Sequence, residues 1–193
     1  MTTSNPVHGT CAPTLTTERL ILRAFCLDDA KDAQLLAGDR KVAAMTERIP
    51  HPNPDGAAES WISGHGEQFA SGKGAVWAIT RRDVGGMIGA IELGIVAEHE
   101  RGTLGYWVGV PYWGQGYMTE AAQRVLQYAF EERHLVNVVA QSFHTNPASG
   151  RVLEKIGMSR EGVLRQHFKK WGEFVDFVCY GILREEYEAR CKR

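Results

Sequence analysis

Apolar residues recur at helical spacing over residues 118–133, and this is the clearest periodic pattern in the chain. The recurring positions are Ala121, Ala122, Val125, Leu126, Ala129 and Phe130. Side chains spaced at i, i+3 and i+4 lie on one face of a helix and leave the other face polar. The pattern therefore predicts an amphipathic helix of about four turns.

Shorter segments have the alternating or continuous apolar pattern of β-strands. They are residues 17–25, 75–80, 87–96, 103–110, 135–142, 160–168 and 173–183. The polar, glycine-containing segment 81–86 has the length of a hairpin turn. The long helix lies between 103–110 and 135–142, and a strand–helix–strand unit of this kind requires parallel pairing of its two strands.

Further helices are predicted at residues 30–38, 57–70 and 148–156, although Gly64 and Gly66 weaken the second of them. For the last helix, Asn146 is a favourable N-cap, Pro147 suits the first helical position, and Gly157 suits the end. The predicted fold class is α/β, with a mixed central β-sheet flanked by helices.

The chain has 193 residues, which suits one domain with a sizeable core. We expect that domain to span residues 16–188, between a loose N-terminal tail over 1–15 and a C-terminal tail over 189–193. The charged segment 184–193 is expected to be a tail as well.

Charge and composition narrow the class of protein further. The 22 basic and 23 acidic residues give a net charge of −1, so nothing favours a nucleic-acid or membrane-surface partner. No apolar run approaches the length of a membrane span, and no signal pattern begins the chain. The four cysteines form no CxxC pair and the seven histidines no HExxH motif, so we expect a cytoplasmic protein with no metal.

A glycine-rich loop lies between the strand 103–110 and the long helix. The segment Gly114-Gln115-Gly116 is neither a P-loop nor a complete GxGxxG motif, because Thr119 occupies the place of the third glycine. One interpretation is a tight strand-to-helix turn. The other is an anion site, in which backbone amides at the helix N-terminus hold a pyrophosphate. The amides concerned belong to Gly114, Gln115, Gly116, Tyr117, Met118 and Thr119.

A second strand-to-helix junction favours the anion site. It is the N-terminus of the helix predicted at 148–156, and we call such a helix N-terminus at the end of a strand a helix mouth. The strand 135–142 is followed by polar residues and by the helix that begins near Asn146. If the two central strands are parallel, both helix mouths lie at the carboxyl ends of adjacent strands. Ligands of open α/β sheets bind at that position.

The motifs around these two helix mouths resemble those of a known family. The sequences GYWVGVPYWGQGYMTEA (105–121) and NPASGRVLEKIGM (146–158) are similar to the GNAT superfamily of N-acetyltransferases, and within it to the Rim-type branch of ribosomal-protein N-terminal acetyltransferases. The strand sequence TERLILR (17–23) and the pair Asp176 and Tyr180 agree with that branch. The resemblance covers residues 16–188. Pro111 departs from the pattern of the wider superfamily, which usually has Gln or Arg there, but this variation is common in the Rim-type branch.

The resemblance implies acetyl-CoA as the acyl donor and a primary amine as the acceptor. Pyrophosphate would bind the loop amides, and pantetheine would bind backbone groups near Val108 and Val110 and the side chain of Asn146. Arg151 and Lys155 would either reach CoA phosphates or form a solvated helix face. The alternatives are a catalytically silent acyl-CoA-binding module that acts as a sensor or scaffold, and a phosphate-ligand enzyme of another family.

Catalytic candidates follow from what amine acetylation requires. Glu92 could accept the proton of the amine, directly or through water, or be a solvent-facing strand residue; His144 is a second candidate base. Ser149 could protonate the leaving thiolate, or only cap a helix amide. Tyr180 could replace Ser149 in that role, or be a core residue.

The amine acceptor cannot be identified from the sequence. Its pocket is expected to be built from residues 45–75 and 165–175, and the aromatic side chains that could contribute are Trp61, Phe69, Phe168 and Trp171. A homodimer is expected only by analogy with the family.

Overall fold

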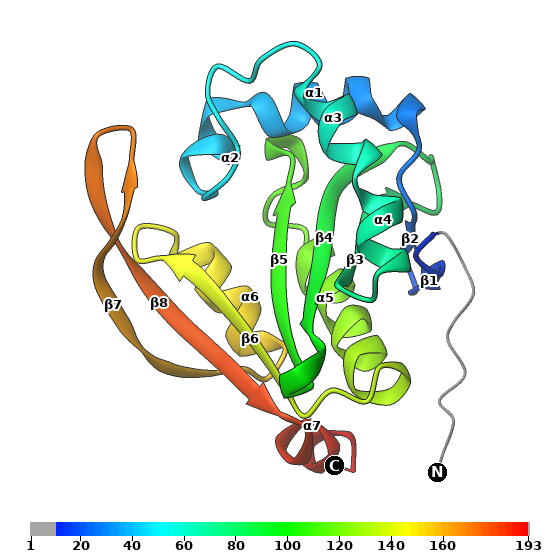
Figure 1. The fold of residues 1–193 in the computed structure, drawn as a ribbon, viewed down its shortest axis with the longest axis vertical. Coiled ribbons are helices and arrows are strands. Elements are labelled where there is room, and N and C mark those ends of the chain that lie inside the picture. Colours follow the sequence, from blue (N-terminus) through cyan, green and yellow to red (C-terminus); the bar gives the residue numbers. More distant parts are fainter. Residues whose placement is uncertain (1–10, 193) are drawn as a thin grey trace.

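A computed structural model describes residues 11–192. Its strands form one eight-stranded sheet in the order β1-β2-β3-β4-β5-β6-β8-β7. The strands are β1 Leu15–Thr16, β2 Leu20–Arg23, β3 Gly74–Arg81, β4 Met87–Val96, β5 Arg101–Val108, β6 Asn137–Phe143, β7 Ser159–Lys170 and β8 Glu173–Leu183. Figure 1 shows the hairpin of β7 and β8 projecting on one side and α5 and α6 packed along the sheet.

The helices lie on both sides of this sheet. They are α1 Ala30–Gly38, α2 Arg40–Ala44, α3 Ala57–Ser63, α4 His65–Ala70, α5 Tyr117–Gln127, α6 Pro147–Lys155 and α7 Arg184–Cys191. A π-helical turn, Tyr128–Glu132, continues α5, and short 3₁₀ turns occupy Leu27–Asp29, Ala97–His99 and Val110–Tyr112. The predicted fold class, a mixed sheet flanked by helices, is confirmed.

The strand pairing determines where the sheet opens. Neighbouring strands are antiparallel except for β5 and β6, which are parallel as predicted. Their pairing starts at Arg101 with Asn137 and stops at Leu104 with Ala140. Beyond that point β5 stays paired with β4, and β6 stays paired with β8. The two strands therefore diverge toward their carboxyl ends, as Figure 1 shows.

Side chains alternate between two packed layers, as expected for a sheet covered on both faces. In β3, Trp77 and Ile79 belong to the cluster that includes the apolar face of α5, and the Trp77 ring lies edge-on to Tyr128, 5.4 Å away. Ala78, between them, packs in a separate cluster with residues of α1 and α3, such as Ala33. The apolar pattern that predicts α5 thus corresponds to a buried face.

Some local predictions differ from the structure. The predicted helix 57–70 is two helices that meet at Gly64, where a glycine weakens the helix. α2 was not expected; it begins where the Asp39 side chain accepts a hydrogen bond from the Lys41 amide. The charged segment 184–193 is not a plain tail, because α7 occupies most of it.

The predicted N-terminal tail, residues 1–15, falls mostly outside the described residues. Within the described part, Leu15 is buried and pairs with Leu22 as part of β1. The sheet therefore begins one residue earlier than the predicted domain boundary.

One histidine is packed in the layer of α1, α3 and α4 without polar partners. The imidazole of His65 lies edge-on to Phe25 and Trp61, with ring centroids 5.2 and 4.5 Å away. Neither ring nitrogen has a hydrogen-bond partner among the described residues. Burial lowers the pKa of His65 to about 4, and the charge of Glu92 only partly offsets this.

We predict that His65 makes the folded protein less stable in mild acid. The pKa is about 4 in the folded state and 6.5 in the unfolded state, so the unfolded chain binds an extra proton as the pH falls from 6.5 toward 4. Allowing for partial exposure, the free energy of unfolding should fall by about 1–2 kcal/mol over this range. Urea unfolding at several pH values should show a smaller fall for His65→Leu. His99→Gln, an exposed control, should behave like the parent; equal falls in all three proteins would contradict the prediction.

Candidate active site

The glycine loop takes a backbone conformation that requires glycine. Gly114 and Gly116 have φ values of 74° and 80°, in the left-handed region that favours glycine. A Cβ on Gly114 would meet no heavy atom within 4 Å, so the space beside the loop is open. Gly116 is also the N-cap of α5 and provides no side-chain cap. The first amides of α5 are thus available to an anion.

The predicted loop residues would contribute backbone rather than side chains. Tyr117 and Met118 bury their side chains in the core. The side chain of Gln115 donates a hydrogen bond to the carbonyl of Pro111, 2.9 Å away. Thr119 lies in the same first turn of α5. A ligand at this helix mouth would therefore be recognised mainly by N–H groups, which agrees with the absence of a polar side chain at position 111.

Arg19, in the link that precedes β2, binds the backbone of the glycine loop. Its guanidinium donates to the carbonyl of Gln115 at 3.1 Å and to Glu120 at 2.6 Å, and it lies 4.6 Å from the centre of the Tyr117 ring. Thr17 also donates to Glu120. Burial raises the pKa of Glu120, but the hydrogen bonds from Thr17 and Arg19 outweigh it and hold that pKa below its usual value. Arg19 thus connects the glycine loop to the first turn of α5.

The predicted pantetheine edge is partly occupied within the molecule. The carbonyl of Val108 accepts a hydrogen bond from the indole N–H of Trp113 at 2.7 Å. The carbonyl of Val110 accepts one from the backbone amide of Trp113 at 3.2 Å. A ligand along this edge would have to compete with Trp113 for both carbonyls.

The second helix mouth has the cap that the sequence predicts. The side-chain oxygen of Asn146 accepts a hydrogen bond from the amide of Ser149 at 3.2 Å, and Pro147 begins α6. Because Asn146 provides the cap, the hydroxyl of Ser149 is not needed for it. That hydroxyl lies 2.9 Å from the hydroxyl of Tyr106 in β5.

The sequence did not single out Tyr106, which contacts the predicted site residue Ser149. It belongs to the GYW motif, but the motif gave no role for it. Tyr106 pairs with Ile91 across β4 and β5, and both pack on the face that α5 covers. Burial raises the pKa of Tyr106 well above its ordinary value, with a smaller opposing effect from the hydrogen bond to Ser149. The phenol therefore keeps its proton at neutral pH.

Glu92 lies on the opposite face of the sheet. Its carboxylate accepts a hydrogen bond from Gln68 at 2.9 Å and forms an ion pair with Arg48 at 2.7 Å. Its side chain is only 20% exposed, whereas that of Arg48 is 75% exposed. Glu92 pairs with Gly105, where a Cβ would meet no heavy atom within 4 Å. Glu92 therefore borders open space but already has two partners.

Three of the remaining candidates are exposed and one is buried. His144 is exposed, and its backbone amide binds the carbonyl of Asp176. Arg151 and Lys155 are exposed on α6. Tyr180 is buried in the core cluster, and its hydroxyl lies beside Gly150, so both of its interpretations stay predictions. The structure thus brings Asn146 and Ser149 together with a tyrosine, Tyr106.

The two predicted acceptor regions come together. Lys170, at the end of β7, donates hydrogen bonds to the carbonyls of Thr46 and Ile49 at 2.7 and 3.0 Å. The rings of His51 and Trp171 lie 5.9 Å apart. Burial lowers the pKa of Lys170. The segment 46–51 therefore lies against the tip of the β7–β8 hairpin.

The four predicted acceptor aromatics lie in different environments. Trp171 is 46% exposed, whereas Phe69 is buried in the core. Phe168 stacks with Phe177, and Trp61 packs against Phe25 and His65. Of these four side chains, Trp171 is the best placed to meet an incoming molecule.

Comparison with known proteins identifies the family. Residues 19–159 match the model of the acetyltransferase (GNAT) domain, which is more than half of the chain. The chain belongs to the GNAT acetyltransferase family. It is 31% identical to the uncharacterized N-acetyltransferase YoaA of Bacillus subtilis, over 89% of this chain and 97% of that relative. The predicted enzyme class, an N-acetyltransferase, is confirmed.

Solved structures of acetyltransferases have the same fold. A GNAT-family acetyltransferase from Bacillus anthracis superposes with a TM-score of 0.80 at 25% identity, over 90% of this chain and 99% of that one. The ribosomal L7/L12 α-N-protein acetyltransferase RimL, in complex with coenzyme A, has a TM-score of 0.80 at 18% identity, over 89% and 98% of the two chains. The resemblance to the Rim-type branch is confirmed at the level of the fold.

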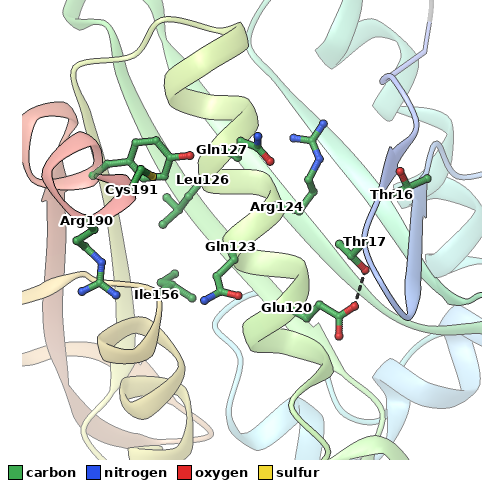
Figure 2. A pocket seen from close by; sticks show the side chains of 11 residues that line it. Thr16, Thr17, Glu120, Gln123, Arg124, Leu126, Gln127, Ile156, Arg190 and Cys191 are labelled. Atoms are coloured by element: carbon green, nitrogen blue, oxygen red, sulfur yellow. Dashed lines mark hydrogen bonds between the residues drawn. The ribbon is translucent and has the colours of Figure 1, made fainter. Parts of the chain in front are cut away.

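A cavity of about 500 Å³ lies elsewhere on this GNAT domain. Figure 2 shows it on the polar face of α5, between residues such as Gln123 and Gln127 and the side chain of Arg190. None of the predicted catalytic or acetyl-CoA-binding residues lines it. Within residues 11–192, no His, Cys, Asp and Glu side chains gather as a metal site would require, and no helix is long and apolar enough to cross a membrane.

We predict that Arg19 is needed for tight CoA binding by this acetyltransferase. Arg19→Met removes the hydrogen bond to the Gln115 carbonyl and the ion pair with Glu120, so the glycine loop should lose its fixed conformation. The Kd for CoA, measured by calorimetry, should rise about tenfold, or ~1.4 kcal/mol. Arg101→Met, at the other end of β5, should leave the Kd unchanged. A folded Arg19→Met protein with the parental Kd would show that the loop does not depend on this contact.

Proposed function

We propose that the protein transfers an acetyl group from acetyl-CoA to a primary amine. The observation that carries this proposal is the end of the β5–β6 pairing after Leu104, with both helix mouths at the carboxyl ends of the diverging strands. The amides of residues 114–119 would hold the pyrophosphate, and pantetheine would enter between the strands. The coenzyme A complex of RimL, a protein of the same fold, supports the choice of donor.

The reaction is a direct attack of the neutral amine on the thioester carbonyl carbon. A C–N bond forms, the C–S bond breaks, and the sulfur leaves with the electron pair. The nitrogen, which carries an extra proton after the attack, loses that proton to water. The N–H of Val110 would stabilise the carbonyl oxygen as it gains negative charge. Ser149 would give its proton to the thiolate, whose ordinary pKa is about 8.5, and would regain a proton from water.

Glu92 would take the proton from the amine, directly or through water. An alkyl amine is largely protonated at neutral pH, so it must lose this proton before it can attack the thioester. Because Arg48 occupies one carboxylate oxygen of Glu92, the guanidinium must move aside or share the carboxylate with the substrate cation. Because Arg48 is highly exposed, its displacement should cost little free energy, since exposed ion pairs contribute little to stability.

The acceptor remains defined only by its class. A peptide or protein N-terminus and a small-molecule amine both meet the chemical requirements. Arg151 and Lys155 as phosphate contacts, the homodimer and the cytoplasmic location also stay predictions.

We predict that Ser149→Ala slows turnover without weakening donor binding. Release of CoA should be measured over a panel of amines that includes ribosomal-protein N-terminal peptides. With an active acceptor, kcat should fall about 10²-fold, as expected for the loss of a proton donor, while the Kd for acetyl-CoA changes less than about twofold. Ser159→Ala, an exposed serine in β7, should retain parental kcat.

The same assay separates the competing functions. Donor binding without CoA release for any amine in the panel would favour the catalytically silent module. Failure to bind acetyl-CoA at all would overturn the whole proposal. Unchanged turnover in Ser149→Ala would remove Ser149 alone from the mechanism.

We predict that Arg48 competes with the amine for Glu92. In Arg48→Gln the KM for the amine should fall about two- to fivefold, the effect expected from losing an exposed ion pair. The KM for acetyl-CoA should not change. Arg160→Gln, on exposed β7, is the matched control. A higher KM for the amine would show instead that Arg48 helps to bind the acceptor, and an effect that persists in a Glu92→Gln background would show that it does not act through Glu92.

A further inference from the structure

The hydroxyl of Tyr106 contacts Ser149 twice. It lies 2.9 Å from the serine hydroxyl oxygen and 3.2 Å from the serine carbonyl oxygen. We propose that Tyr106 is a positioning residue that orients the Ser149 hydroxyl for protonation of the leaving thiolate. This inference rests on the proposed role of Ser149 and extends it to a second residue.

The hydrogen-bonding capacities of the three groups support this role. The carbonyl of Ser149 can only accept, so a hydrogen bond there requires Tyr106 to donate. The phenol oxygen can at the same time accept the proton of the serine hydroxyl. Both contacts are then satisfied in the resting state, and the serine proton has a defined direction.

A rotation of the phenol O–H alone changes this arrangement. When the phenol proton turns from the carbonyl to the serine hydroxyl oxygen, the serine proton is free to point toward the sulfur. As the S–H bond forms and the serine O–H bond breaks, the phenol O–H would stabilise the negative charge left on the serine oxygen. A proton from water then restores the serine. Tyr106 keeps its own proton throughout, consistent with its burial and raised pKa.

Neighbouring contacts hold both Tyr106 and Ser149 in place. The Asn146 side chain holds the amide of Ser149, so the serine backbone is fixed at both its N–H and its C=O. Tyr106 is fixed by pairing of β5 with β4. On α6, a Cβ at Gly150 would lie 2.6 Å from the hydroxyl of Tyr180, so the absence of a side chain there allows the helix to pack close to the sheet.

A structural explanation competes with this proposal. A partly buried phenol is stabilised by a hydrogen-bond partner, and Ser149 could serve only that need. The two explanations differ in what happens when Ser149 is already absent. If Tyr106 acts through the serine hydroxyl, removing the phenol hydroxyl should then have no further effect on turnover.

The test compares Tyr106→Phe, Ser149→Ala and the double variant by the CoA-release assay. We expect Tyr106→Phe to lower kcat about tenfold, less than loss of the serine itself, with the KM for acetyl-CoA within about twofold of the parent. The double variant should be no slower than Ser149→Ala. Tyr128→Phe removes the hydroxyl of another buried tyrosine, away from Ser149, and should keep parental kcat. Thermal unfolding of each variant checks that the fold is retained.

Each contrary outcome has a distinct meaning. An unchanged kcat in Tyr106→Phe, beside a slow Ser149→Ala, would overturn the positioning role and leave the proposed function standing. An equal loss from Tyr106→Phe with and without Ser149 would show a structural role and also overturn it. Parental turnover in Ser149→Ala would overturn both the serine mechanism and the inference built on it.

Discussion

The parallel pairing of β5 and β6 is short, and the geometry of the site depends on where it ends. Each strand continues beyond Leu104 and Ala140 with its outer neighbour only. In the described part of the chain, the facing edges of β5 and β6 have no strand partner beyond this point, although the carbonyl of Val108 binds the indole of Trp113, and buried peptide groups need hydrogen-bond partners. An extended ligand that enters between the strands would provide them, as an added strand does. The same divergence places the mouths of α5 and α6 on the two sides of the opening.

The alternation of side chains along β5 divides the proposed chemistry between two faces. Gly105 lies beside Glu92, and the next residue, Tyr106, points to the other face and meets Ser149. In the proposed mechanism, proton removal from the amine and proton delivery to the sulfur would therefore take place on opposite sides of β5. Such a separation would let acceptor and donor approach from different faces, and it would keep the proposed base from exchanging a proton directly with the proposed acid.

Local signals predicted the framework of the site better than its contacts. The apolar period of α5, the Asn146 cap and the need for a parallel crossover are all encoded within short segments, and each agrees with the structure. The Tyr106–Ser149 and Arg48–Glu92 pairs join residues 43 and 44 positions apart. No periodicity or spacing rule specifies such pairs, because they depend on which strand faces which helix. α2 has only five residues and begins at the Asp39 cap, and α7 has an almost wholly polar sequence. Neither helix therefore has the apolar periodicity by which a helix is predicted from sequence.

The donor and acceptor halves of the site are held by different kinds of contact. The glycine loop is bound by Arg19 and presents backbone amides. Every residue except proline has a backbone amide, so these groups do not depend on the identity of the side chains. In the predicted acceptor region, Lys170 from the hairpin binds backbone carbonyls of segment 46–51, and the side chain of Arg48 forms an exposed ion pair with Glu92. A backbone site retains a recognisable glycine motif, whereas a side-chain site can change with its substrate. This difference explains why the family and the proposed donor can be inferred from the sequence, whereas the proposed acceptor is defined only by its class, a primary amine.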